Sequence, residues 1–389
     1  MTEWIECTLD KLGEIVGGAT PSTKCEDYYG GSIPWITPKD LSSFKGRYIT
    51  SGERNITEKG LASCSAQMMP KDAVLFTSRA PIGYIAIASQ SVCTNQGFKS
   101  IVVNEKADPL FVYYLLKYNK DAIEAMGSGT TFKEVSGKTM RAVKVRIPLD
   151  VSYQKRIAAV LDSLDTKIEN NERINDNLQQ QAFSVFDNLI ANAENNDYTV
   201  SNYAFLNPKR TLAKNQVARS IDMSQLSTSG AFPSGWEMKP FNGGMRFTNG
   251  DTLLARITPC LENGKTAFID FLDDGEVAFG STEYIVLAPK NDTPPEMLYC
   301  LARYPAFVDY AVKNMNGSSG RQRVSAETVG QYRLPLFDKH SLVLFKEVVS
   351  PMFLKMRYNS LENIRLSELR DALLPKLMSG EIDVSAVQL

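Results

Sequence analysis

The chain has 389 residues, which is too long for one compact core and suits two domains with connections. With 43% apolar and 22% charged residues and a net charge of −1, it lacks a globally basic surface, so any nucleic-acid binding must use local patches or a larger assembly. The absence of long apolar runs, of a signal-peptide pattern and of C-x-x-C spacing among six cysteines predicts a cytoplasmic protein with free thiols and no contact with a membrane.

The first half of the chain predicts a β-rich region followed by one long helix. Short β-branched or aromatic runs at 73–76, 85–88 and 101–103 are separated by Gly, Pro, Asn and Ser, and a short helix is predicted near 109–125. The long helix is predicted near 151–190, where apolar residues recur with heptad spacing. The seam consists of Ile157, Leu161, Leu164 and Ile168, then Leu178, Ala182, Val185 and Leu189. Counting through the middle, the seam falls on Asn171 and Asn175.

The second half repeats the first. Lys167 aligns with Lys355, an offset of 188 residues, and this offset places Asn171 on Asn359 and Asn175 on Asn363. A second long helix is therefore predicted near 339–378, preceded by a β-rich region with a strand-like run at 278–287 and a short helix near 294–313. "GSGTTFKEVS" before the first helix resembles "GSSGRQRVS" before the second. Arg370 falls where the first helix has Ala182, and we expect Leu369 to take that seam position.

The duplicated asparagines suggest how the helices pair. A helix of about 55–60 Å with a long apolar seam needs a partner, and its own copy is the comparable helix in the chain. If the copies pack antiparallel, Asn171 should face Asn363 and Asn175 should face Asn359, whereas a parallel pair would set Asn171 against Asn359. Buried asparagines would then fix the register; the alternative is an exposed stretch where the seam frays.

The residues that most enzymes need are missing. The single histidine, His340, excludes a histidine-based triad and a histidine-ligated zinc site. The Gly-Lys-Thr triplets at 137–139 and 264–266 lack the earlier glycine of a phosphate loop, and we find neither a dinucleotide-binding glycine motif nor an Asp/Asn-Pro-Pro-aromatic tetrapeptide of adenine methyltransferases. We therefore predict a protein without a catalytic centre, a metal or a cofactor of its own.

Polar turn segments recur at equivalent points of the two copies. Their Arg, Lys, Asn, Gln, Ser and Thr side chains suit contact with base edges and phosphates, although a polar turn is more often only a turn. The candidate DNA-binding residues of the first copy are Thr20, Ser22, Lys24, Thr37, Lys39, Ser78, Arg79, Asn95, Gln96, Thr130, Thr131 and Lys133. Those of the second copy are Lys209, Arg210, Arg256, Thr258, Asn263, Lys265, Thr266, Arg321, Gln322 and Arg323.

These features resemble one protein family over essentially the whole chain. "QKRIAAVLDSLDTKIENNERINDNLQ" and "LRDALLPKLMSGEI" are similar to the two conserved regions of the specificity subunits of type I restriction-modification systems. "GATPSTKCEDYYGGSIPWITPKDL" and "NGDTLLARITPCLENGKTAFI" are similar to segments of that family's target-recognition domains. The resemblance implies an α+β fold in which a long antiparallel two-helix coiled coil separates two β-rich target-recognition domains. The expected parts are recognition domains at 1–150 and 195–337 and spacer helices at 151–194 and 338–389.

The resemblance also implies a function. Each recognition domain would read one half of a bipartite site in double-stranded DNA, and the coiled coil would set the gap between the halves. The subunit would direct adenine methylation by two modification subunits and cleavage by restriction subunits. S-adenosylmethionine, ATP and magnesium are expected on those partners.

Apolar residues off the seam predict where partners bind. A two-helix coil cannot cover all of them, so we expect some to face the modification subunits. They are Val160, Phe183 and Phe186 on the first helix and Val348 and Leu374 on the second.

Two other functions stay open at this point. A stand-alone DNA methyltransferase or nuclease would need the motifs found missing above. A coiled-coil scaffold with β-rich protein- or ligand-binding modules would lack the steep salt dependence that phosphate contact gives to DNA binding.

Overall fold

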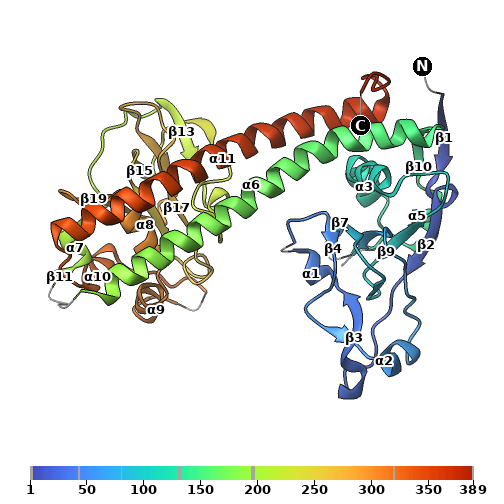
Figure 1. Ribbon diagram of the computed structural model, residues 1–389, viewed down its shortest axis with the longest axis horizontal. Coiled ribbons are helices and arrows are strands. Elements are labelled where there is room, and N and C mark those ends of the chain that lie inside the picture. Colours follow the sequence, from blue (N-terminus) through green and yellow to red (C-terminus); the bar gives the residue numbers. More distant parts are fainter. Residues whose placement is uncertain are drawn as a thin grey trace. The chain divides into compact units, whose positions relative to one another are not determined.

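The computed structural model describes residues 3–42, 44–79, 81–129, 133–193, 198–318 and 320–387. The chain forms two compact units, unit 1 with residues 1–166 and 367–389 and unit 2 with residues 167–366. Helices α6 (Val151–Ala191) and α11 (Lys339–Ser379) have 41 residues each, and each contributes residues to both units (Figure 1). They confirm the two predicted long helices. The division of the chain at 150, 194 and 337 stays a prediction.

The described residues of unit 1 form three sheets and five short α-helices, with 3-10 helices at Leu9–Lys11 and Glu26–Tyr28. Its strands form a five-stranded sheet, a three-stranded sheet and a two-stranded ribbon. In spatial order these are β2 (Gly13–Gly17), β9 (Lys99–Val103), β6 (Val74–Ser78), β7 (Ile82–Ala88) and β4 (Tyr48–Ile49); β5 (Asn55–Ile56), β3 (Tyr29–Ile36) and β8 (Cys93–Thr94); and β1 (Trp4–Thr8) with β10 (Lys144–Pro148). The helices are α1 (Pro38–Ser42), α2 (Glu58–Ala62), α3 (Pro109–Tyr118), α4 (Lys120–Ala125) and α5 (Gly137–Ala142). The runs predicted at 73–76, 85–88 and 101–103 are strands β6, β7 and β9.

Where the structure describes unit 2, it forms two four-stranded sheets, one ribbon and four short α-helices, with a 3-10 helix at Met223–Gln225. The strands in spatial order are β12 (Ala204–Leu206), β19 (Tyr284–Pro289), β16 (Thr252–Ala255) and β17 (Thr266–Phe268); β14 (Glu237–Pro240), β13 (Val217–Ile221), β18 (Ala278–Gly280) and β15 (Met245–Phe247); and β11 (Tyr198–Thr199) with β20 (Arg333–Leu334). The helices are α7 (Val200–Tyr203), α8 (Pro295–Arg303), α9 (Pro305–Lys313) and α10 (Ala326–Gly330).

The sheets confirm the internal repeat. The antiparallel order β2-β9-β6-β7 of unit 1 recurs as β12-β19-β16-β17 in unit 2. The parallel pair β3-β8 recurs as β13-β18, and the ribbon β1-β10 recurs as β11-β20. The two units therefore share these strand pairings, each set followed in the chain by one of the long helices, while β4 in unit 1 and β15 in unit 2 add pairings that the other unit lacks.

Local chemistry explains where the helices begin and break. Asp150 and Asp338, which are 188 residues apart, accept the backbone N–H groups of Ser152 and Ser341 at 2.8 and 2.9 Å and so start the two long helices. The short helix predicted near 294–313 is two helices, because Pro305 lacks the N–H that would continue α8. The helix predicted near 109–125 likewise divides, at Asn119. The run at 278–287 also differs from expectation, since a turn divides it into β18 and β19 of different sheets.

Each unit buries helix residues in its own core. In unit 1, Ile157, Leu161 and Leu377 pack with the buried face of α3. In unit 2, Ala182 and Phe345 pack with α8. All six cysteines are free thiols, as predicted.

Within unit 2, the four seam asparagines meet as the antiparallel arrangement predicts. Asn171 Nδ2 donates to Asn363 Oδ1 at 2.8 Å, and Asn359 Nδ2 donates to Asn175 Oδ1 at 2.8 Å. Two further amide bonds are also images of each other, since Asn363 donates to the carbonyl oxygen of Ile168 and Asn175 to that of Met356, both at 3.4 Å. These two pairs of bonds follow the repeat, and Asn171 and Asn359 are only 1% exposed.

Loss of one seam amide should be costly. Asn171 also donates to Glu362 Oε2 at 2.7 Å, so Asn171→Ala removes two hydrogen bonds in a buried place. We expect the free energy of unfolding of unit 2 to fall by about 1–3 kcal/mol. Asn170→Ala, at the exposed neighbouring position, should change it by less than about 0.5 kcal/mol. Equal effects of the two substitutions, measured by urea denaturation, would contradict a role for the amide network.

In unit 1 the seam contains a charged pair, which corrects one expectation. Leu369 is 47% exposed and does not take the seam position. Arg370 takes it, and its Nη1 donates to Asp165 Oδ1 at 2.7 Å. Asp165 Oδ2 accepts the hydroxyl of Tyr114 at 2.8 Å, and Lys117 Nζ lies 4.0 Å away. Burial alone would raise the pKa of Asp165, but Lys117, Arg370 and Tyr114 hold it below its ordinary value.

The structure also corrects part of the predicted partner surface. Phe186 is 1% exposed and lies edge-on to Tyr304 and Phe345 in the core of unit 2, so it cannot contact another subunit. Phe183 stacks on Tyr299 in the same unit. Val160 and Leu374 are half-buried against the core of unit 1. Val348 is 47% exposed and stays a candidate.

Candidate nucleic-acid interface

In unit 1, several predicted residues come together where strands end. The backbone N–H of Ala19, just after β2, donates to the carbonyl of Thr94 at 3.0 Å. At the end of β6, the N–H of Ser78 donates to the carbonyl of Gly97 at 2.7 Å, and the carbonyl of Ser78 accepts the N–H of Val135 at 2.9 Å. Residues 18–20, 78–79, 94–97 and 133–135 therefore form one continuous surface, loop cluster 1.

Close backbone approach places Thr20 beside Gln96. A Cβ atom on Gly18 would lie 2.1 Å from the carbonyl oxygen of Thr94 and 2.2 Å from that of Asn95, so only glycine fits there. The Thr20 hydroxyl then donates to Gln96 Oε1. The NH₂ group of the exposed Gln96 can still donate to a base or a phosphate.

Two other residues of loop cluster 1 serve the loop itself. Asn95 Oδ1 accepts the N–H of Gly97 at 2.8 Å, which is the ordinary role of asparagine in a turn. Ser78 is 0% exposed, and its hydroxyl donates to the carbonyl of Gly97 at 3.2 Å. The prediction that Ser78 contacts DNA is therefore wrong, because its side chain has no path to the surface.

Two basic side chains lie near the carboxylate of Glu134, Arg79 of loop cluster 1 and Lys99 of β9. Arg79 Nη1 lies 3.8 Å from Glu134 Oε2, and Lys99 Nζ lies 3.7 Å from Glu134 Oε1. Lys133 is exposed beside them. Predicted residues Thr130 and Thr131 lie outside the described residues.

The remaining candidates of unit 1 lie in separate turns. Ser22 and Lys24 are exposed. Thr37 donates from its hydroxyl to Asp40 Oδ2 at 2.6 Å, and exposed Lys39 pairs with Glu53 at 2.6 Å.

Unit 2 builds the equivalent surface with different side chains. The N–H of Arg256 donates to the carbonyl of Glu283 at 3.0 Å, and the carbonyl of Arg256 accepts the N–H of Val324 at 3.0 Å. The N–H of Thr258 donates to the carbonyl of Gln322 at 3.0 Å. Residues 256–258, 281–283, 316–318 and 320–324 form loop cluster 2.

Some candidates of unit 2 are available for contact and others are not. Lys209, Asn263 and Arg321 are exposed, and Gln322 is half-buried. Lys265 is half-buried, and its Nζ donates to the carbonyl of Met223 at 2.7 Å. The prediction for Thr266 is wrong, because this residue of β17 is 0% exposed.

Arg210 is committed to an internal ion pair. Its Nη2 donates to both carboxylate oxygens of Asp251, at 2.6 and 2.7 Å, and Asp251 is 1% exposed. Burial raises the pKa of Asp251 to about 6, although the N–H of Thr248 and the Arg210 guanidinium act to lower it. The structure corrects the prediction for Arg210, because its charge offsets that of a buried carboxylate.

Arg323 is held by Glu283 at the mouth of loop cluster 2. Its Nε lies 2.9 and 3.0 Å from the two oxygens of Glu283, and its Nη2 donates to Glu283 Oε1 at 2.7 Å. The hydrogen bonds from Arg323 lower the pKa of Glu283, and the same pairing raises that of Arg323. The guanidinium is therefore fixed in orientation and stays charged.

Glu134 and Glu283 were not among the predicted residues. The predicted residues were chosen for side chains that contact phosphates and base edges, and a carboxylate repels phosphate. The available signal was the repeat itself, since "FKEVS" and "RQRVS" align Glu134 with Arg323 immediately before the shared Val-Ser.

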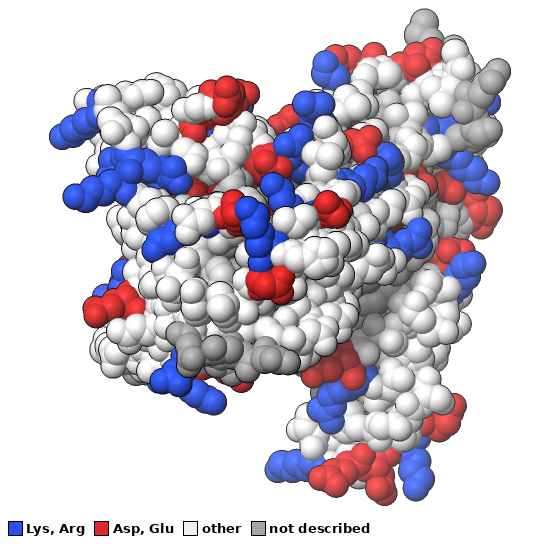
Figure 2. All heavy atoms as spheres, turned by 60° about the vertical axis from the view of Figure 1, so that its left-hand side comes forward, with Lys and Arg blue, Asp and Glu red and all other residues white. Residues whose placement is uncertain are grey.

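The wider surface agrees with the near-neutral composition. In the view of Figure 2, Lys and Arg side chains lie among Asp and Glu over much of this face, with one group of basic side chains at its upper left. Over the described residues, no group of three or more His, Cys, Asp and Glu could hold a metal ion. No helix among the described residues is both long enough and apolar enough to cross a bilayer.

Known proteins are similar to this chain in sequence. Residues 1–180 match the family model described as type I restriction modification DNA specificity domain. The type I restriction enzyme MjaIX specificity subunit of Methanocaldococcus jannaschii is 30% identical, over 98% of this chain and 94% of its own length. The EcoR124I/EcoR124II specificity subunit of Escherichia coli is 29% identical over 41% of this chain and 40% of its own.

A solved structure agrees at the level of the fold. The S subunit of a type I restriction-modification system from M. genitalium has a TM-score of 0.62 at 16% identity, over 97% of this chain and 96% of that one. The chain has two β-rich units with shared strand pairings, and it is 30% identical to a curated specificity subunit over nearly the whole length of both proteins. The chain therefore belongs to the specificity subunits of type I restriction-modification systems.

Proposed function

We propose that this protein is the non-catalytic DNA-recognition subunit of a type I restriction-modification complex. Unit 1 reads one half of a bipartite site through loop cluster 1, and unit 2 reads the other half through loop cluster 2. The two long helices, whose residues are shared between the units, set the number of unspecified base pairs between the halves. The observation that carries the proposal is the duplicated loop cluster, with one backbone framework and different exposed polar side chains. Such a pair can read two different sequences in the same manner.

Partners supply the chemistry in this proposal. Two modification subunits methylate adenine with S-adenosylmethionine, and restriction subunits use ATP and magnesium. These proteins also contribute phosphate contacts, which suits a recognition subunit whose own net charge is −1. The scaffold alternative has no specific observation in its favour.

An exchange of one recognition region tests this function. Residues 195–337 are replaced by the same region of a relative, and the chimera is expressed with the modification subunit in a host whose methylated adenines are then mapped. We expect one half of the recognised site to change and the other half to persist. A change in both halves, or an unchanged site, would contradict two independent readers.

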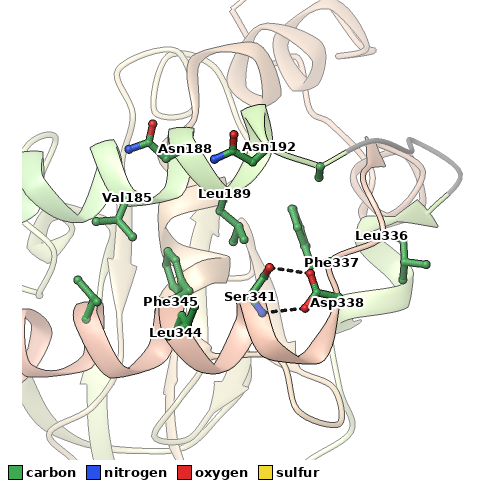
Figure 3. A pocket seen from close by; sticks show the side chains of 12 residues that line it. Val185, Asn188, Leu189, Asn192, Leu336, Phe337, Asp338, Ser341, Leu344 and Phe345 are labelled. Carbon is green, nitrogen blue, oxygen red and sulfur yellow. Dashed lines mark hydrogen bonds between the residues drawn. The ribbon is translucent and has the colours of Figure 1, made fainter.

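The partner surface on unit 2 is a groove between its two long helices. It has a volume of about 580 Å³, with Val185 and Leu189 of α6 on one side and Leu344, Phe345 and Val348 of α11 on the other (Figure 3). Leu344 and Val348 are 46% and 47% exposed. Exposed apolar side chains one helical turn apart are typical of a face that another protein covers.

Charges in this groove should prevent partner binding. We expect Leu344→Asp combined with Val348→Asp to leave the protein folded and to abolish co-purification with the modification subunit, because two carboxylates would lose their water on binding. Met126→Asp, at a residue that is 49% exposed in unit 1, is the matched control and should co-purify. Undiminished co-purification of the double variant would place the partner elsewhere.

A further inference from the structure

The two loop clusters share a set of equivalent backbone hydrogen bonds. In unit 1 the N–H of Glu134 donates to the carbonyl of Ser128 at 2.9 Å, and the carbonyl of Glu134 accepts the N–H of Ser128 at 3.1 Å. In unit 2 Arg323 pairs in the same way with Asn316, at 2.9 Å in both directions. The next residue in each case is a valine whose N–H binds the end of the equivalent strand, at Ser78 or Arg256. Glu134 and Arg323 therefore occupy the same backbone position with opposite charge.

The same turn supports this position in both units. The N–H of Gly97 donates to Asn95 Oδ1 at 2.8 Å, and the N–H of Glu283 donates to Ser281 Oγ at 3.1 Å. Serines that follow the valines cap α5 and α10 through equivalent hydrogen bonds of 3.0 and 2.9 Å. The side chains of Glu134 and Arg323 are 40% and 39% exposed, so both reach the surface to the same degree.

Arg323 is prepared to donate in a fixed direction. Of its five N–H groups, Nε–H and one on Nη2 face Glu283, and one on Nη1 donates to the carbonyl of Arg321 at 3.1 Å. Among the described residues, one N–H on Nη1 and one on Nη2 are left for another acceptor. Two such donors on a planar group match N7 and O6 of guanine.

Glu134 has the complementary chemistry. Its oxygens lie 3.7 and 3.8 Å from Lys99 and Arg79, beyond hydrogen-bonding distance, so the carboxylate can accept further hydrogen bonds. A carboxylate repels phosphate. The donors that a major groove offers to it are the amino groups of cytosine N4 and adenine N6.

We propose that this matched position determines one base in each half-site. Arg323, oriented by Glu283, reads a guanine in the half-site of unit 2, and Glu134 reads a cytosine or adenine amino group at the matched point in the half-site of unit 1. The inference rests on the proposed function and adds residues and base classes to it. Glu283 is a positioning residue, because it acts through Arg323.

The test is the recognised sequence of single variants. The full chain is expressed with its modification subunit, and methylated adenines are mapped on a plasmid library of random sequence. Arg323→Gln should reduce the preference for guanine at one position by roughly 10- to 100-fold and leave the other half-site unchanged. Arg323→Lys, which keeps the charge, should do the same, because lysine cannot make the two parallel hydrogen bonds. Glu283→Gln should weaken the preference at that same position.

The second part of the test uses a variant of unit 1. Glu134→Gln should relax one cytosine or adenine in the other half-site only. The matched control is Lys339→Gln, which removes a charge from an exposed pair with Asp292 in unit 2 and should leave the site unchanged.

The inference is overturned if Arg323→Gln keeps the guanine preference. It is also overturned if Arg323→Gln lowers methylation of all sequences evenly, which would mark a phosphate contact. A wild-type complex with no bipartite site would overturn the proposed function together with this inference. A bipartite site that Arg323→Gln and Glu134→Gln both leave intact would overturn this inference alone.

Discussion

Arg210→Met should lower the free energy of unfolding of unit 2 by about 3–5 kcal/mol, because it leaves a buried carboxylate without its counter-charge. Asp251 is 1% exposed, and its remaining hydrogen bond is with the N–H of Thr248 at 2.8 Å. Lys209→Met, at the exposed neighbouring position, is the matched control and should change stability by less than about 0.5 kcal/mol. Hydrogen exchange at the amides of β16 measures the opening of this region directly.

The stability that Arg210→Met loses should depend on pH, and the pKa of Asp251 gives the direction. The pKa of Asp251 in the folded protein is about 6, above the ordinary value of 3.8, so the folded state binds the proton more tightly than the unfolded state. The stability that this proton contributes is complete below pH 3.8 and is lost as pH rises through 6. Without Arg210 the preference for the protonated form increases, and the variant should be closer to wild type at pH 5 than at pH 8. Normal stability with lost DNA binding would instead assign Arg210 to DNA.

The sequence predicts the helices and the repeat because both depend on local order along the chain. Heptad spacing locates α6, and the offset of 188 residues then locates α11, each to within one residue at both ends. The sequence also pairs Asn171 with Asn363. Two copies that pack antiparallel are related by a twofold axis, so aligning the two helix sequences fixes every facing pair.

The sequence predicts the exposure of loop side chains less well, because their contacts are with residues distant in the chain. Ser78 and Thr266 look like polar turn residues, yet both are the buried polar positions of strands. Arg210 resembles other basic loop residues, and its partner is 41 residues away at Asp251. A pattern of residue types cannot distinguish an arginine that offsets a buried charge from one that faces solvent. The distinction requires knowing which carboxylate is buried.

Arg370→Met should lower the free energy of unfolding of unit 1 by about 3–5 kcal/mol, since it removes the closest counter-charge of a carboxylate in the helix seam. The Asp165 side chain is 8% exposed, and Lys117, at 4.0 Å, is too distant for a hydrogen bond in place of the one from Arg370 at 2.7 Å. Arg365→Met, on an exposed part of the same helix, is the matched control and should have an effect below about 0.5 kcal/mol.

The internal repeat suggests a triple variant in which the carboxylate that Arg370→Met leaves unpaired is also removed. At the positions of Asp165 and Arg370, unit 2 has Phe353 and Ala182, which are 1% and 0% exposed in its core. An apolar seam is therefore compatible with this framework. Asp165→Leu with Arg370→Met and Tyr114→Phe should recover most of the lost stability, because the unpaired carboxylate and hydroxyl are then removed and Lys117, whose side chain is 33% exposed, keeps access to water. Recovery would show that the large cost of Arg370→Met comes from the unpaired carboxylate. If the triple variant is as unstable as the single one, the seam of unit 1 requires the polar cluster itself, and urea denaturation of the three proteins separates these results.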